Sequence, residues 1–377
     1  MHTLLTTAQG SFQLNRFPVR KNDLLRAWDA ADEYLLAQFA ELNLPVASSL
    51  VIVNDGFGAL SLALHAYQPT AISDSYLSQQ ATLQNLQVNG LPEHAVTLLD
   101  SLSLPPQAID CLLIKIPKTL ALLEYQLHSL RPLLKADCRI IAAGMAKNIP
   151  SSVWDLLARL IGPTTTSLAV KKARLIFAQL DPTLQLPANP YPSCYLLENT
   201  ELQIVNHANV FSRPSLDIGT RFLLQHLPDD PNYQDLIDLG CGNGLVGLML
   251  AKQMPNAKLS FVDESFMALA SARHNYQAVF GQSRPAQFIA ADCLSGFEPQ
   301  SADCIVCNPP FHQQHAVGDH IAWQMFQHAQ RVLRSGGELR VIGNRHLNYH
   351  QHLKKLFGQF ETVASNNKFT IVKALKN

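Results

Sequence analysis

Short apolar runs alternate with longer segments of helical periodicity along the second half of the chain. A short apolar run predicts a buried strand, and apolar positions three and four residues apart predict a helix. Strands are expected at 236–238, 258–262, 287–290, 303–307 and 338–342, and helices at 216–227, 245–254, 266–279 and 323–333. We expect the last helix to end at Ser335 to Gly337, which would serve as a glycine C-cap. This alternation predicts a mostly parallel sheet with helices on both faces.

The first half of the chain repeats the same order of patterns, which indicates two copies of one α/β unit. The segments 51–58, 72–74 and 110–117 parallel 236–242, 261–263 and 303–310. In this alignment Asp74 lies opposite Asp263, and no glycine lies opposite Gly244. The first copy carries Lys115 to Lys118 where the second carries Asn308 to Phe311. We therefore expect the first copy to be degenerate, with either a docking or a purely structural role.

A proline-rich segment at 184–192 separates the two copies, because its prolines fit neither a helix interior nor a central strand. Two strand-like runs around residues 198–200 follow it and predict a hairpin. We therefore expect a degenerate domain at residues 1–186 and a catalytic domain at residues 187–377.

The composition is that of a globular protein without a net electrostatic preference. Of the 377 residues, 47% are hydrophobic, and basic and acidic residues balance at 29 each. Any basic surface that binds a nucleic acid must therefore be a local patch. Six basic residues of the first half either line one such face or are scattered, solvated side chains: Lys115, Lys118, Lys147, Lys171, Lys172 and Arg174.

The seven cysteines are irregularly spaced and describe no disulfide framework, which favours the cytoplasm. Cys304 and Cys307 form a C-x-x-C motif, but no second Cys or His pair stands at zinc-site spacing. We expect core thiols and no metal. The start of the chain has no signal-peptide pattern, and no segment approaches the ~20 apolar residues of a membrane span.

A glycine-rich segment lies where the first strand of the second copy turns into a helix. Glycines let the backbone turn tightly there and approach a ligand, so a nucleoside cofactor fits. Gly247 completes a G-x-G-x-x-G pattern with two of these glycines, which leaves a dinucleotide site as an alternative. The candidate cofactor residues of the segment are Asp238, Gly240, Cys241, Gly242, Asn243 and Gly244.

Two aspartates follow the next two strands and complete the candidate cofactor site. Asp263 ends the second strand, where its carboxylate either accepts hydrogen bonds from ribose hydroxyls or caps the following helix. Asp292 follows the third strand, where it either contacts the adenine amino group or forms a turn.

The segment Asn308, Pro309, Pro310 and Phe311 follows a buried strand and distinguishes the two cofactor alternatives. The Asn308 side-chain oxygen and the Pro309 carbonyl can both accept hydrogen bonds from a substrate amine, and Phe311 can stack on a planar base. An aromatic amine is a poor nucleophile because its lone pair is delocalised. Two acceptors on its hydrogens favour a pyramidal nitrogen and stabilise the charge that develops during methylation. This arrangement favours S-adenosylmethionine as cofactor and has no use in hydride transfer.

Polar residues flank this segment and the entry to the second copy. No carboxylate or Cys near His312 and His315 completes a set of metal ligands. We therefore expect these two histidines to touch the substrate. The extension that carries Phe211, Arg213 and Asp217 either covers the cofactor or remains a plain surface.

The segments 209–213, 238–244 and 308–315 resemble the bacterial ribosomal RNA guanine-N2 methyltransferases. The segments 27–34, 115–123 and 162–166 narrow the resemblance to the large-subunit methyltransferase G family. The resemblance implies two tandem class I methyltransferase domains with only the second active, and N2-methylguanine in 23S rRNA as the product. The sister family, the small-subunit methyltransferase C, shares the catalytic motif, so that rRNA remains an alternative. Methylation of protein glutamine or DNA adenine, and a non-catalytic RNA-binding assembly factor, are further alternatives.

Overall fold

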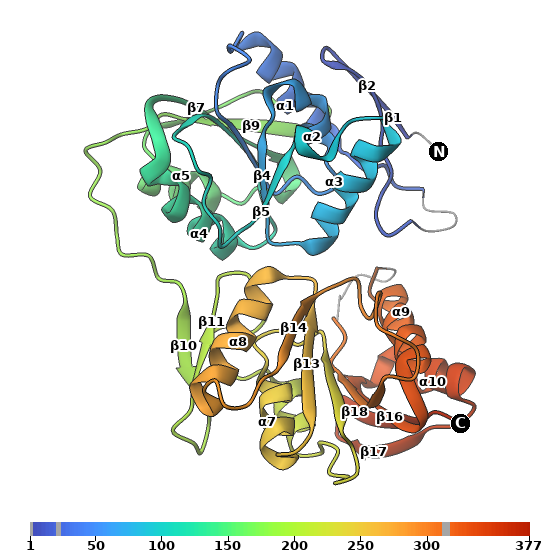
Figure 1. Ribbon diagram of the computed structural model, residues 1–377. Coiled ribbons are helices and arrows are strands. Elements are labelled where there is room, and N and C mark those ends of the chain that lie inside the picture. The colour runs from blue at the N-terminus through green and yellow to red at the C-terminus, as the bar shows by residue number, and fades with distance from the viewer. Residues whose placement is uncertain (1–2, 20–23, 311–316) are drawn as a thin grey trace. The chain divides into compact units, whose positions relative to one another are not determined.

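The computed structural model describes residues 3–19, 24–310 and 317–377. The chain forms two compact units, Met1–Tyr191 and Pro192–Asn377, drawn in Figure 1. Irregular chain joins β9 (Ala173–Ala178) of the first unit to β10 (Ser193–Leu196) of the second. The division after Tyr191 lies inside the proline-rich segment, five residues beyond the boundary expected at 186/187.

The second unit holds a seven-stranded sheet in the order β14-β13-β12-β15-β16-β18-β17. β18 runs opposite to the other six strands, which all run in one direction. The strands are β12 (Asp235–Leu239), β13 (Lys258–Asp263), β14 (Gln287–Ala290), β15 (Ala302–Cys307), β16 (Leu333–Asn344), β17 (Glu361–Ser365) and β18 (Phe369–Leu375). The helices are α6 (Ile218–Leu224), α7 (Leu245–Gln253), α8 (Phe266–Phe280), α9 (Val317–Val332) and α10 (Tyr349–Phe357).

Helices cover both faces of this sheet, as the alternation of patterns predicts. Along β12, Leu236 joins a core with residues of α7 and α8, whereas Ile237 joins a core with residues of α9 and α10. Successive strand residues point to opposite faces, so one apolar run serves both layers. Cys304 and Cys307 are buried in these two different cores, which confirms them as core thiols.

The predicted hairpin is confirmed by β10 and β11 (Gln203–Asn206), which pair antiparallel beside α8 (Figure 1). The predicted glycine C-cap is wrong, because α9 ends at Val332 and β16 begins at Leu333. The register of β15 and β16 jumps from Ala302↔Leu333 to Cys304↔Glu338, so Ser335 to Gly337 form an irregularity within the strand. Gly336 adopts φ +80° and donates its N–H to the carbonyl of Lys376, the residue directly after β18.

The first unit repeats the same topology, with the sheet order β5-β4-β3-β6-β7-β9-β8. Its hairpin is β1 (Leu4–Thr7) with β2 (Gly10–Gln13). Its other strands are β3 (Leu50–Val53), β4 (Thr70–Ser73), β5 (Thr97–Asp100), β6 (Ile109–Lys115), β7 (Leu134–Met145), β8 (Thr164–Thr166) and β9. Its helices are α1 (Ala30–Glu41), α2 (Ala59–Ala63), α3 (Tyr76–Val88), α4 (Leu120–Leu130) and α5 (Ser152–Leu160).

The register of the two sheets corrects the alignment of the two copies at two positions. Gly58 and Gly244 are each the residue before the first crossover helix, with φ of 81° and 77°, so a glycine does lie opposite Gly244. Ser73, not Asp74, lies opposite Asp263, because each stands two residues before the serine that caps the next helix. Sequence similarity alone missed both because the strand ends differ in residue type while their backbone register is the same.

Candidate functional site

The glycine loop connects β12 to α7 at the carboxyl edge of the second sheet, where open α/β sheets bind ligands. Gly240, Gly242 and Gly244 all have positive φ, which a residue with a Cβ rarely adopts. A Cβ on Gly244 would lie 2.6 Å from the Cβ of Ala272, so this glycine permits close packing of the loop on α8. A Cβ on Gly242 would meet nothing within 4 Å, so this part of the loop faces open space that a ligand can enter.

Asp238, the second-last residue of β12, is buried and fixes the start of α7. Its Oδ2 accepts a 2.8 Å hydrogen bond from the N–H of Gly247. Burial, with the charge of Asp263 nearby, raises the pKa of this carboxyl to about 7. The neighbouring Cys241 is buried in the core beneath the loop, so its side chain supports the loop from below.

Asp263 joins the glycine loop to the end of β13. Its Oδ2 accepts from the Gly242 N–H at 2.9 Å, and its Oδ1 accepts from the Ser265 N–H at 3.0 Å. Burial raises the pKa of this carboxyl above its ordinary value, whereas these backbone hydrogen bonds lower it. The N-cap of α8 is Ser265, so the capping role considered for Asp263 is wrong. The Glu264 N–H is a third backbone donor to this carboxylate. A carboxylate accepts about four hydrogen bonds, so a position remains for a ribose hydroxyl.

A cluster of asparagines holds the hairpin against the glycine loop. The Asn243 side chain donates to Asn206 Oδ1 at 3.0 Å and accepts from the Leu245 N–H at 3.2 Å. The buried Asn275 of α8 donates to the carbonyls of both Asn243 and Val205. The side chain of Asn243 is thus engaged in positioning the loop. Asn206 and Asn275 were not predicted from the sequence, because nothing in their local pattern marks them as partners of the loop.

Asp292 lies in the loop after β14. Both of its carboxylate oxygens accept from Gln324 Nε2 of α9, each at 2.9 Å. The carboxylate is held at the same edge of the sheet as Asp263 while it keeps acceptor positions free.

Asn308 directly follows β15, next to the strand that carries the glycine loop. Its Nδ2 donates to Thr220 Oγ1 at 3.1 Å, whereas its Oδ1 is buried and has no hydrogen-bond partner among the residues that the structure describes. A buried acceptor left unpaired costs free energy, so it marks a position that a ligand donor can fill. Pro309 is buried and Pro310 is exposed.

Several predicted residues are exposed, cap a helix or lie outside the described residues. Phe311, His312 and His315 lie outside the described residues. Phe211 is 69% exposed, and Asp217 is the N-cap of α6. At the end of β16 the structure adds Asn344, whose buried Oδ1 also lacks a partner within the described ranges.

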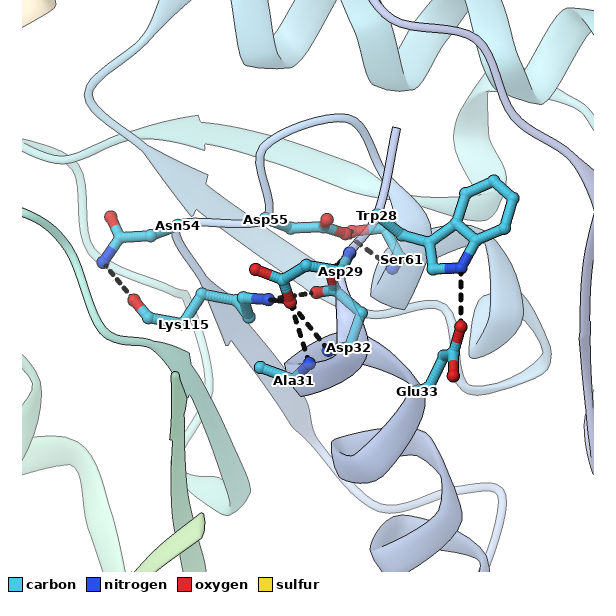
Figure 2. A network of polar contacts seen from close by, with 9 residues as sticks. All are labelled: Trp28, Asp29, Ala31, Asp32, Glu33, Asn54, Asp55, Ser61 and Lys115. Carbon is cyan, nitrogen blue, oxygen red and sulfur yellow. Dashed lines mark hydrogen bonds and ion pairs between the residues drawn. The ribbon is translucent and has the colours of Figure 1, made fainter. Parts of the chain in front are cut away.

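The first unit carries different residues at the equivalent edge of its sheet. By register, Ile52 stands in place of Asp238, Ser73 in place of Asp263 and Lys115 in place of Asn308. The ammonium of Lys115 lies 2.8 Å from Asp29 Oδ1 and 2.7 Å from Asp32 Oδ1. Figure 2 shows Lys115 pointing at these two carboxylates, with Asp55 close by.

This network corrects one sequence prediction. Lys115 is mostly buried and ion-paired, so it is not part of an exposed basic face. Its burial opposes the charged form, but Asp32 and Asp29 outweigh this effect and raise the pKa of the lysine. Four of the other basic residues are exposed as expected, namely Lys118, Lys147, Lys171 and Lys172.

The turn that bears Lys171 and Lys172 has positive φ at both lysines, 47° and 65°. Lys171 also pairs with Glu33 at 2.7 Å. The Ala146 N–H donates to the Lys172 carbonyl, which places Lys147 next to this turn. Three of the exposed lysines therefore share one region of the first unit.

The described residues contain neither a group of metal ligands nor a membrane-spanning helix. No three His, Cys, Asp or Glu side chains are grouped there so as to hold a metal ion. None of the helices there is long and apolar enough to cross a membrane.

Comparison with known proteins finds similarity over both units. The family model for the RLMG N-terminal domain matches residues 2–182, and that for the methyltransferase small domain matches residues 201–373. A ribosomal RNA large subunit methyltransferase G of Aeromonas salmonicida is 51% identical over 377 residues, which cover 100% of both chains. A protein of the same name from Streptomyces coelicolor is 48% identical, over 99% of this chain and 100% of that one.

A solved structure shares the fold of the whole chain. The Thermus thermophilus 16S rRNA N2 G1207 methyltransferase, in complex with AdoMet and guanosine, has a TM-score of 0.76 and 20% identity. The match covers 100% of this chain and 98% of that one. The prediction of two tandem methyltransferase-type α/β domains is confirmed.

Proposed function

The chain belongs to the ribosomal RNA large subunit methyltransferase G family, and we propose that it methylates the exocyclic N2 amine of a guanine in 23S rRNA. The observation that carries this assignment is the buried Oδ1 of Asn308 at the carboxyl edge of the second sheet, to which none of the described residues donates a hydrogen bond. An orphaned acceptor suits a substrate that brings an N–H donor, and an exocyclic amine brings two.

S-adenosylmethionine supplies an electrophilic methyl group when it is bound. The glycine loop would hold its amino-acid end, with room at Gly242 for close approach. Asp263 would accept from a ribose hydroxyl with the acceptor position that its three backbone donors leave free. Asp292 would accept from its adenine amine while Gln324 fixes the carboxylate.

Asn308 and the Pro309 carbonyl would orient the substrate amine. Their two oxygens would accept its two hydrogens and so favour a pyramidal nitrogen whose lone pair faces the methyl donor. Methylation makes the nitrogen acidic, so water can take the surplus proton and no strong base is needed. Phe311, which lies outside the described residues, would stack on the base.

The first unit would dock the RNA through Lys118, Lys147, Lys171 and Lys172. These side chains are exposed, and a cluster of lysines attracts phosphates without reading the sequence. A 23S rRNA substrate also implies a cytoplasmic protein. The small-subunit rRNA, protein glutamine and DNA adenine are competing substrates, because each offers a planar nitrogen to the same acceptors.

Transfer of labelled methyl from S-adenosylmethionine tests the proposal. Unmodified 23S and 16S rRNA, DNA and protein are offered separately to the wild type, to Asn308→Ala and to Asn232→Ala. Asn232 is an exposed asparagine before β12, so its loss controls for the substitution itself. We expect N2-methylguanine in 23S rRNA with the wild type and the control, and about 100-fold slower transfer with Asn308→Ala. Label in another substrate, or none at all, contradicts the proposal.

A further inference from the structure

The Asn308 side chain is held by a hydrogen-bonded chain that begins in α6. Asp217 is the N-cap of this helix, and its Oδ2 accepts from the Thr220 N–H at 2.8 Å. The same Oδ2 accepts from the Thr220 hydroxyl at 3.2 Å. Thr220 Oγ1 in turn accepts from Asn308 Nδ2 at 3.1 Å. The chain thus runs from Asn308 to Thr220 to Asp217.

This chain determines which end of the Asn308 amide faces outward. A hydroxyl has one hydrogen, and the carboxylate of Asp217 can only accept, so the Thr220 hydrogen is directed to Asp217. The oxygen of Thr220 is then available only as an acceptor, so it requires the NH₂ end of the Asn308 amide. Rotating the amide by 180° would set two acceptors against each other. The Oδ1 atom is therefore turned away from α6, and in the described part of the chain this buried oxygen has no donor.

The packing around α6 leaves room for this arrangement. A Cβ on Gly219 would lie 3.0 Å from Asp217 Oδ2 and 3.2 Å from the Phe369 ring. A side chain at this position would displace the carboxylate that fixes the Thr220 hydroxyl. The sequence from Asp217 to Thr220 therefore serves the orientation of an amide that lies 88 residues later in the chain.

We propose that Thr220, fixed by Asp217, is a positioning residue that keeps Asn308 Oδ1 directed at the substrate amine. The inference rests on the proposed function, since it assigns to Asn308 the role of amine acceptor. Without Thr220 the amide can rotate, and in the rotated state an NH₂ group would oppose the substrate amine. Substrate binding depends mainly on other contacts, so the loss falls on the rate of methyl transfer.

Substitution of Thr220 by valine and by serine tests this role. Valine keeps the shape of the side chain and removes the hydroxyl, and serine keeps the hydroxyl. We expect Thr220→Val to lower kcat about 10- to 100-fold with KM for RNA and for S-adenosylmethionine within about twofold. Thr220→Ser should retain a kcat within about threefold of the wild type. Equal kcat values for Thr220→Val and the wild type would overturn the proposal. Equal losses of kcat in Thr220→Val and Thr220→Ser would overturn it too.

Two further measurements separate this role from a fault of folding or from failure of the proposed function. In an Asn308→Ala background, Thr220→Val should cause no further loss of rate, because Thr220 acts through Asn308. In ¹⁵N-asparagine-labelled protein, the Asn308 side-chain NH₂ should be protected from hydrogen exchange in the wild type and Thr220→Ser, and unprotected in Thr220→Val. This second measurement needs no substrate. Equal protection in all three proteins overturns the positioning role even where methyl transfer is absent.

Discussion

Lys115 and Asn308 occupy equivalent positions in the two units. Each directly follows the residue that pairs with the last residue of the central strand, β3 in the first unit and β12 in the second. That residue is Ile114 opposite Val53 in the first sheet and Cys307 opposite Leu239 in the second. In the first unit the position holds a cation whose charge Asp29 and Asp32 neutralise. In the second it holds an amide whose oxygen receives no hydrogen bond from residues 3–19, 24–310 or 317–377. The same edge of the fold carries internal ion pairs in one copy and the proposed acceptor of the substrate amine in the other.

Removal of the ammonium in Lys115→Met should destabilise the first unit by about 3–5 kcal/mol. The reason is that the substitution leaves two carboxylates without their buried cation. Urea unfolding followed by the fluorescence of Trp28 and Trp154 measures the change. Lys118→Met, at an exposed position, should change the free energy of unfolding by less than about 0.5 kcal/mol. Similar values for the two variants would show that the ion pairs add no stability.

Replacement of Lys118, Lys147, Lys171 and Lys172 by alanine should weaken binding of 23S rRNA. Each lost phosphate contact should lower the slope of log K against log salt by about 0.7–0.9, because fewer counterions are released. Fluorescence anisotropy at several salt concentrations measures this slope. Alanine at Lys252 and Lys258, two exposed lysines of the second unit, is the control. A slope that stays at the wild-type value excludes the docking role.

The variant Asp263→Asn should bind S-adenosylmethionine about 10- to 100-fold more weakly. An amide cannot accept from the Gly242 N–H, from the Ser265 N–H and from ribose hydroxyls at once, and a charged hydrogen bond is worth about 1.5–3 kcal/mol. Isothermal titration calorimetry measures the dissociation constant. Glu201→Gln, in the exposed hairpin turn, removes the same charge and should leave affinity unchanged. An unaltered affinity in Asp263→Asn would remove this aspartate from the cofactor site.

The stability of the second unit should depend on pH through Asp238. Burial raises the pKa of this carboxyl from 3.8 to about 7 in the folded state, so the folded state binds a proton that the unfolded state has released. The stabilisation is complete below pH 3.8 and is lost as the pH rises to about 7. The slope is at most about 1.4 kcal/mol per pH unit in this window, and Asp238 contributes no further change above it.

Asp238→Asn removes this titration, so its stability relative to the wild type should increase from pH 5 to pH 7 and then stay constant. Urea unfolding followed by Trp323 fluorescence, with phenylalanine at Trp28 and Trp154 in both proteins, measures the difference. A difference that is the same at pH 5.5 and pH 8 would mean that Asp238 titrates near its ordinary pKa.

Local patterns predicted most of the regular structure. The strand expected at 287–290 is β14 as observed, and the helix expected at 266–279 is α8 with one residue added. The errors occur where the partner is distant. The glycines Gly336 and Gly337 serve a strand irregularity opposite Lys376, not a helix end, and only the pairing of β16 with its neighbours distinguishes the two.

The sequence by itself determined the order of the elements, the duplication and the residue types at the site, because these depend on periodicity and on motifs read along the chain. The tertiary structure decided which residues form hydrogen bonds and ion pairs with one another. It withdrew Lys115 from the surface by pairing it with Asp29 and Asp32, from 86 and 83 residues away along the chain. It also fixed the Asn308 amide through Thr220. Hydrogen bonds and ion pairs form within about 3–4 Å in space, and only the folded chain brings such distant residues within that reach.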